Sequence, residues 1–278
     1  MPEFDGSTGK IHYGRLLPEN PTSVVVFLYG LGEHIGSYEP FTEALNAEGI
    51  AVWASDHLGH GRSEGEPVLI DRIDDLVDDA EQLVTLARAE HPDLPLVVIG
   101  HSLGSAVVTL LVAERLLPGG VRPAGLVLAR SALIPSAELP ERPDDGGGLE
   151  ALLTSGADPM SLRKDPGELT RNAEYAQQIR QDPLTWQGGL RFTTLRALVD
   201  GWHRLDVVIK SKALKLPVLL VHGEDDDLAP AAGARRAAEL LPDGRAGIFP
   251  LDRHNILNEI DRDEVYRVLL EFEAHLPR

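Results

Sequence analysis

Residues 96–105 read LVVIGHSLGS, an aliphatic run that ends abruptly in Gly-His-Ser-Leu-Gly. An apolar, helix-like segment follows over residues 106–117. This order predicts a buried strand, a sharp turn and a buried helix, with Ser102 at the apex of the turn. Gly100 and Gly104 suit such a turn because side chains there would collide with the neighbouring strand and helix. The segment therefore predicts a serine nucleophile.

The composition limits the classes of protein to which the chain can belong. Its 278 residues are 43% hydrophobic and include 26 Lys and Arg against 44 Asp and Glu, for a formal net charge of -18. This acidic balance argues against nucleic acid as a partner, because binding a phosphate backbone needs a basic patch. The chain has no cysteine, which excludes disulfides, thiolate metal sites and a cysteine nucleophile.

Neither a targeting signal nor a membrane span is predicted. Residues 1–6 are polar and acidic, unlike a signal peptide. No apolar run approaches the ~20 residues that a bilayer-spanning helix needs. We therefore expect a cytoplasmic protein without a transmembrane segment.

Strands and helices alternate along most of the chain, which predicts an α/β fold with a mostly parallel sheet and helices on both faces. Apolar runs predict strands at residues 10–17, 24–29, 50–55, 96–99, 125–129, 218–221 and 246–251. Helical spacing or stop signals predict helices at residues 39–48, 71–90, 106–117, 231–241 and 259–276.

Residues 131–205 interrupt this alternation with turn signals and short helical pieces. Ligands bind at the carboxyl ends of the strands in such sheets, so we expect these residues to form a cap there. The core is then residues 1–130 and 206–278. The cap is rich in apolar side chains, namely Leu133, Ile134, Leu149, Leu152, Leu153, Met160, Leu184, Trp186, Leu190, Phe192, Leu195, Leu198 and Trp202.

Part of this apolar surface packs on the sheet in any insertion, but so much of it beside the site also suits an acyl chain. Trp186, Phe192 and Trp202 of the cap, together with Tyr29 of the core, are the residues that we expect to contact the substrate. An apolar cap also allows a transient contact with a membrane surface.

A serine needs a base, and the base needs a third group to hold it. Two late strands lead into HGEDDDL at residues 222–228 and DRHN at residues 252–255. The order serine, acid, histidine is the one that this topology requires, which makes His254 the candidate base. Spacing alone does not choose among the three aspartates at residues 225–227. Such an acidic loop can also bind a divalent cation or simply face solvent.

The other histidines have structural interpretations. His57 and His60 lie three residues apart, but no third ligand of suitable spacing is near, so we expect hydrogen bonds within a loop and no metal site. His101 is expected to pack inside the turn around the serine. His222 ends a buried strand and is expected to be a core histidine.

Residues 30–32, Gly-Leu-Gly, follow an apolar strand. They resemble a phosphate-binding glycine loop only weakly, because Gly36 comes one residue late for Gly-x-Gly-x-x-Gly. An oxyanion loop is the better interpretation, since small residues let the N–H of Leu31 approach a reacting carbonyl. The second donor is the N–H of Leu103, at the start of the helix behind the serine.

Four blocks together resemble the monoacylglycerol lipase group of α/β-hydrolases, which overlaps with the hydrolases grouped as serine aminopeptidase-like. The blocks are GLGEHIGSY at 30–38, DHLGHGRS at 56–63, GHSLG at 100–104 and, in the expected cap, DPLTWQGGL at 182–190. The resemblance covers nearly the whole chain and implies the α/β-hydrolase fold.

The resemblance also implies roles for individual residues. Ser102 is the nucleophile and His254 the base, and the acid is Asp226, the fifth residue of the block HGEDD at 222–226. No cofactor and no metal are implied.

By the same resemblance, Leu31 and Leu103 supply the N–H groups of the oxyanion hole. The family usually has His where this chain has Tyr29. The backbone donors do not depend on that side chain, so we expect Tyr29 to affect the support of the loop or the shape of the substrate pocket.

The expected function is hydrolysis of carboxylic esters with an apolar acyl chain, above all monoacylglycerols, through an acyl-enzyme. The partner is then a small lipid or ester. An aminopeptidase or amidase on the same residues is the main alternative, and it needs a carboxylate in the cap, for which Glu168, Glu174 and Asp182 are candidates. A non-catalytic ligand-binding protein is a further alternative, against which the intact serine, acid and histidine argue.

Overall fold

The computed structural model describes residues 2–130 and 152–277 of the chain. Among them, eight strands form one sheet in the order β1-β2-β4-β3-β5-β6-β7-β8. The first two strands run antiparallel to their neighbours and the other pairs are parallel. The strands are β1 (Glu3–Asp5), β2 (Lys10–Leu16), β3 (Ser23–Leu28), β4 (Ile50–Ser55), β5 (Leu96–His101), β6 (Gly125–Ala129), β7 (Val218–Gly223) and β8 (Gly244–Phe249).

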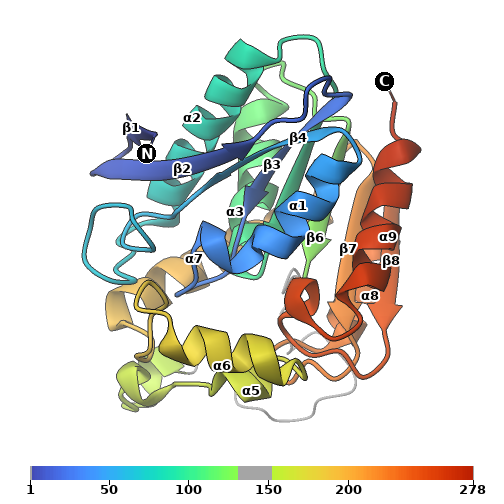
Figure 1. Ribbon diagram of the computed structural model, residues 1–278. Helices are drawn as coiled ribbons and strands as arrows, with labels where there is room; N and C mark the ends of the chain where they lie inside the picture. The colour runs from blue at the N-terminus through green and yellow to red at the C-terminus, as the bar shows by residue number, and fades with distance from the viewer. Residues whose placement is uncertain (1, 131–151, 278) are drawn as a thin grey trace.

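Helices cover both faces of the sheet (Figure 1). One face carries α1 (Glu39–Ala47) and α9 (Arg262–Ala274), whose apolar side chains share a core with the strands. The other carries α2 (Ile73–Glu90), α3 (Leu103–Leu111), α7 (Phe192–Lys210) and α8 (Ala231–Leu240). The expected α/β fold, a mostly parallel sheet between two helical layers, is confirmed.

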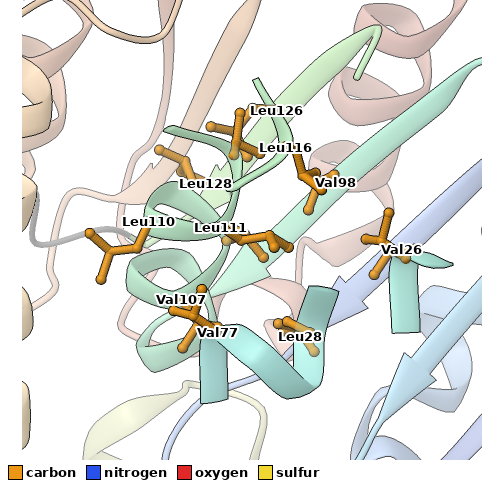
Figure 2. Close-up of a cluster of buried hydrophobic side chains, with 14 of the residues drawn as sticks. Val26, Leu28, Val77, Val98, Val107, Leu110, Leu111, Leu116, Leu126 and Leu128 are labelled. Atoms are coloured by element: carbon orange, nitrogen blue, oxygen red, sulfur yellow. The ribbon is translucent and has the colours of Figure 1, made fainter. Parts of the chain in front are cut away.

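Helix α3 is buried in the middle of the second layer. Figure 2 shows Val107, Leu110 and Leu111 of this helix among side chains from the neighbouring strands and α2. A helix that is apolar on most of its circumference is stable only when it is surrounded in this way. It begins three residues earlier than predicted, directly after Ser102, and continues as a π-helical turn over Val112–Leu116. The start of α3 is therefore fixed against the serine.

The parallel strands end together at one edge of the sheet. Gly100 of β5 pairs with Leu28 of β3 on one side and with Leu128 of β6 on the other, and β6 is in turn paired with β7. The loops that follow β3, β5, β6, β7 and β8 consequently leave the sheet at the same edge, which is where ligands bind in such folds.

Short helices lie beyond this edge (Figure 1). They are a 3₁₀ turn at Pro159–Ser161, α5 (Pro166–Leu169) and α6 (Ala173–Gln181), all within the expected cap. Helix α7 runs through residue 205 and packs against α2 and α3, so the boundaries of the cap stay a prediction. Leu133, Ile134, Leu149 and the glycines at 146–148 lie outside the described residues. No helix in the described ranges is long and apolar enough to cross a membrane.

Candidate active site

Ser102 occupies the turn between β5 and α3. Its backbone has φ 51° and ψ -115°, a conformation that residues other than glycine rarely adopt. The two neighbouring glycines make this turn possible. A Cβ atom at Gly104 would lie 2.2 Å from the carbonyl oxygen of Leu28, and one at Gly100 would lie 2.5 Å from the carbonyl carbon of Gly104. Because both contacts are with rigid backbone, only glycine fits at these positions. The predicted turn is confirmed, and it presents the serine hydroxyl at the edge of the sheet.

The structure brings the three expected side chains together from the loops after β5, β7 and β8. Nε2 of His254 lies 3.1 Å from Oγ of Ser102, within hydrogen-bond distance. Nδ1 of the same ring lies 3.4 Å from Oδ1 of Asp226. Serine, imidazole and carboxylate thus form a continuous chain of polar contacts, although the two ends are 124 residues apart in sequence.

Among the three consecutive aspartates, only Asp226 turns inward. Its side chain is fully buried, and Oδ1 accepts hydrogen bonds from the N–H groups of Leu228 at 2.8 Å and Ala229 at 3.3 Å. Asp225 and Asp227 are exposed. The backbone turn that follows β7 therefore selects one carboxylate for the contact with the imidazole.

Burial and neighbouring charge both act on this pair. Burial raises the pKa of Asp226, but the charges of Arg130 and His254 outweigh it and hold that pKa well below its usual range. Burial, and then the charge of Arg130, lower the pKa of His254 to about 4, against the opposing effect of Asp226. The imidazole is therefore neutral at pH 7, as a general base must be.

Arg130 is a member of this group that the sequence reasoning missed. It directly follows β6, and its Nε donates to Oδ2 of Asp226 at 2.9 Å, while Nη1 lies 3.5 Å from Oγ of Ser102. An arginine belongs to none of the usual combinations of nucleophile, base and acid. Only its position in the chain could have indicated this contact, because the end of β6 lies between the end of β5, which leads to Ser102, and the end of β7, which leads to Asp226.

The Gly-Leu-Gly loop lies against the serine, as expected for an oxyanion loop. Leu31 and Leu103 both line the cavity above Ser102, and Leu103 is the first residue of α3, where helix N–H groups lack partners within the helix. The structure thus places both expected donor residues beside Ser102.

The carboxylate of Glu33, which follows this loop, holds it in place. It accepts hydrogen bonds from the N–H of Gly30 at 3.2 Å, from the hydroxyl of Tyr38 at 2.7 Å and from Nδ2 of Asn255 at 2.9 Å. Burial raises the pKa of Glu33, but hydrogen bonding and charge from His101, with the bonds from Tyr38 and Asn255, lower it to about 2. Glu33 and Asn255 were not recognised from the sequence, although each directly follows a recognised motif.

Tyr29 does not contact the cavity, so the expectation that it binds substrate is wrong. Its side chain is completely buried, and its hydroxyl donates to Oδ1 of Asp56 at 3.1 Å and accepts from the N–H of His57 at 2.9 Å. Tyr29 directly follows β3, and its ring packs against those of Tyr38, His57 and His60. It supports the loop after β4 and not a substrate.

A cavity of about 620 Å³ opens above Ser102 and His254, between the sheet edge and the residues expected to form the cap. Trp186 and Trp202 line it, as expected. Most of the other lining side chains are apolar, including Leu31, Leu103, Ala106, Leu152, Leu162, Leu169, Ile179, Leu190, Leu198, Leu205 and Leu228. A pocket of this size and character suits an apolar ligand with few polar groups.

Phe192 is the second correction among the expected substrate contacts. It begins α7, is 50% exposed and does not line the cavity. The cavity face of α7 is formed by Leu198, Trp202 and Leu205, at helical spacing. Phe192 lies six positions before Leu198, and at about 100° per residue this turns its side chain about 120° away from that face.

The remaining histidines have the structural roles expected of them. Nε2 of His57 bonds to the carbonyl of Tyr29 at 3.0 Å, and Nδ1 of His60 bonds to that of Leu58 at 2.9 Å. Burial, and then the charge of His57, lower the pKa of His60 to about 3. Nε2 of His222, at the end of a buried strand, donates to the carbonyl of Ala229 at 2.9 Å.

Together, the serine turn, the later histidine and acid, and the sheet order define an α/β-hydrolase. A family model described as serine aminopeptidase, S33, matches residues 19–261, and the chain belongs to this family. A monoacylglycerol lipase of Mycolicibacterium smegmatis is 30% identical over 268 residues, which cover 92% of this chain and 90% of the relative. The human monoglyceride lipase is 32% identical over 222 residues, or 79% and 70%.

Comparison with solved structures supports the same class of protein. A crystal structure of the monoacylglycerol lipase of Paleococcus ferrophilus superposes with a TM-score of 0.73 and 27% identity, covering 94% of this chain and 97% of that one. The chain is therefore a monoacylglycerol lipase-like α/β-hydrolase, and it is a carboxylic-ester hydrolase.

Proposed function

We propose that the chain hydrolyses monoacylglycerols through an acyl-enzyme formed on Ser102. The observation that supports this most is the 3.1 Å contact between Oγ of Ser102 and Nε2 of His254 at the base of a covered, mostly apolar cavity. The neighbouring relatives named monoacylglycerol or monoglyceride lipases support the same substrate class.

The proposed reaction has two halves. Oγ of Ser102 attacks the ester carbonyl carbon and gives its proton to Nε2 of His254, which passes it to the leaving alcohol. Water then repeats the sequence on the acyl-enzyme and releases the fatty acid. Asp226 keeps the proton of the free imidazole on Nδ1 and stabilises the imidazolium, and the N–H groups of Leu31 and Leu103 receive the oxyanion.

The cap, proposed to span residues 131–205, would bind the acyl chain and exclude water from the site. Each methylene that enters the cavity gains about 0.8 kcal/mol. Leu162 and Leu228 line the cavity and are more than 40% exposed. This apolar rim supports a transient contact of the cap region with a lipid surface during substrate capture.

An aminopeptidase remains the second candidate because the family carries that description. A substrate amine would need a free carboxylate, yet none of Glu168, Glu174 and Asp182 lines the cavity. Asp182 is bound to Nε2 of His34 at 2.9 Å, and Glu168 completes the capping box of α5. Glu33 does line the cavity, but its carboxylate already accepts hydrogen bonds from the N–H of Gly30 and from the side chains of Tyr38 and Asn255.

A fluorophosphonate probe and a substrate series test the proposal. We expect the probe to label wild-type protein and to leave the Ser102→Ala variant unlabelled. Lauroylglycerol should be cleaved faster than the corresponding diester and triester, because a covered cavity has little room for a second chain. Absence of labelling, or turnover of aminoacyl anilides above that of all the acylglycerols, contradicts the proposed function.

A further inference from the structure

The guanidinium group of Arg130 lies beside the nucleophile on the floor of the cavity. Its Nη1 is 3.5 Å from Oγ of Ser102, and the residue lines the same cavity as His254. Its side chain is 11% exposed, so the group reaches into the site from the sheet edge and is not spread over the outer surface. Any ester that is positioned for attack by Ser102 must therefore lie next to a cation.

The backbone holds Arg130 in this place at a conformational cost. Its φ is 53°, in the left-handed region that residues other than glycine rarely adopt. Its N–H donates to the carbonyl of Val221 at 2.7 Å, and its carbonyl accepts from the N–H of Ser102 at 3.2 Å. The two strands beside it thus maintain the strained conformation, a kind of outlier that concentrates at functional sites.

Much of the hydrogen-bonding capacity of Arg130 is unused among the described residues. A guanidinium has five N–H donors in a planar fork that matches a carboxylate or a phosphate. The contacts found for Arg130 are Nε with Asp226 and Nη1 toward the hydroxyl of Ser102. The donors that remain are at the Nη end of the fork, which is the end beside the nucleophile.

A neutral ester offers this cation no charged partner. In the transition state His254 becomes positively charged, and the charged groups that act on it are Asp226, which favours the imidazolium, and Arg130 and His101, which disfavour it. After burial, the charge of Arg130 is the largest cause that lowers the pKa of His254. An anionic group bound to Arg130 would offset its charge and make His254 a stronger base.

The rest of the cavity wall has the same sign of charge. Among the described residues that line it, Arg130, Arg163 and Lys164 are cations, and Glu33 is the one carboxylate. Lys164 is paired with Asp227 and lies near Glu168, whereas the contact found for Arg163 is the neutral amide oxygen of Gln187 at 3.4 Å. A wall with more cations than anions is unexpected in a chain with a net charge of -18.

We propose that Arg130 is a specificity-determining residue that selects esters carrying a carboxylate or phosphate group close to the scissile ester bond. This inference rests on the proposed function, the acyl-enzyme reaction on Ser102, and extends its substrates from neutral monoacylglycerols to anionic single-chain esters. The attacked carbon lies roughly 3 Å from Oγ, and the anion roughly 3 Å from the guanidinium, which places the anion about two to four bonds from the ester carbonyl.

Two pairs of esters, assayed by titration of the released acid, distinguish the two possible locations of the anion. Lauroyloxyacetate against ethyl laurate tests an anion on the alcohol part. Monoethyl butanedioate against ethyl butanoate tests an anion on the acid part. We expect the wild-type enzyme to prefer the anionic member of one pair by about ten- to a hundredfold in kcat/KM, the usual effect of one charge-assisted hydrogen bond.

Three variants test the role of Arg130 itself. Arg130→Gln should remove the preference, mainly by raising KM for the anionic ester, and should move the acidic limb of the pH profile for the neutral ester to higher pH. Arg130→Lys keeps the charge without the planar fork and should retain part of the preference. Arg236→Gln, on the exposed face of α8, is the matched control and should leave the ratio unchanged.

The proposal is overturned if the wild-type enzyme prefers the anionic ester in neither pair. It is also overturned if Arg130→Gln lowers kcat/KM equally for anionic and neutral esters, because Arg130 would then only position Asp226. Labelling of Ser102 by the fluorophosphonate probe separates these results from failure of the proposed function. A labelled enzyme without a preference for anions contradicts the role of Arg130 alone, whereas an unlabelled wild-type enzyme contradicts the nucleophile.

Discussion

Replacing Asp226 by Asn should lower both activity and stability, for reasons that differ. Oδ1 accepts from two backbone N–H groups and lies against His254, while Oδ2 accepts from Arg130. An amide cannot serve both sides. If its oxygen keeps the backbone bonds, its NH₂ group faces the guanidinium. If its oxygen faces Arg130, its NH₂ group meets the backbone donors and turns His254 to the wrong tautomer. We expect kcat to fall by roughly 10⁴.

The stability effect follows from the charge left behind. Asp226 is fully buried and Arg130 nearly so, and breaking one side of a buried ion pair costs about 3–5 kcal/mol. Because Arg130 keeps some contact with solvent, we expect the lower end, about 3 kcal/mol. For a chain of this size that corresponds to a decrease of roughly 6–12 °C in Tm.

Matched variants separate the two effects. Asp225→Asn and Asp227→Asn change exposed carboxylates in the same loop and should alter kcat and Tm little. The double variant Asp226→Asn with Arg130→Gln removes both charges, so it should recover most of the lost Tm without recovering kcat on a neutral ester. Retention of more than a tenth of kcat in Asp226→Asn, or a large loss in Asp225→Asn instead, would refute the assignment.

Three further outcomes are expected. Ser102→Ala should lower kcat on a short p-nitrophenyl ester by about 10⁶ with little change in Tm, and residual activity above a tenth would place the nucleophile elsewhere. Because the pKa of His254 is lowered to about 4, kcat/KM for a neutral ester should rise through pH 4 and be constant by pH 6; an acidic limb near pH 6.5 contradicts this. In a series of esters of increasing acyl-chain length, kcat/KM of the wild-type enzyme should rise about fourfold per added methylene until the cavity is filled. In the same series, Trp202→Ala should lower kcat/KM more for long-chain esters than for acetyl esters.

The fold was largely predictable because its signals are local. Strands buried on both faces read as continuous aliphatic runs, and the runs at 50–55 and 125–129 match β4 and β6. Boundaries were less predictable where a strand is exposed. Strand β8 begins at Gly244, two residues before the predicted run, because its ladder with β7 includes exposed residues. The short β1 was missed, since a single apolar residue, Phe4, marks its buried side.

The site was predictable only in part, because side-chain direction depends on tertiary structure. Chain order alone placed Ser102 and His254 together, but the choice of Asp226 over its neighbours came from the resemblance to a family. In the structure that choice is made by the N–H groups of Leu228 and Ala229, which no pattern of residue types reveals. Tyr29 was misassigned for the same reason, as its ring turns toward a buried loop.

The proposed catalytic groups are linked by a second network of hydrogen bonds that lies directly behind them. Glu33, His101 and Asn255 each adjoin a proposed catalytic segment, namely the oxyanion loop, Ser102 and His254. Tyr38 bonds to Glu33 at 2.7 Å and lies 2.8 Å from Nδ1 of His101, whose Nε2 donates to the carbonyl of His254 at 3.1 Å.

A site of this kind must hold its groups to within about 0.5 Å, which requires supporting hydrogen bonds and packing around them. Because Asn255 also bonds to Glu33 at 2.9 Å, a displacement of the oxyanion loop would be transmitted to the loop that carries His254. The buried carboxylate of Glu33 therefore does more than support one loop. It links the proposed oxyanion loop, through Gly30, to Asn255 beside the proposed base His254, so these two segments are positioned together.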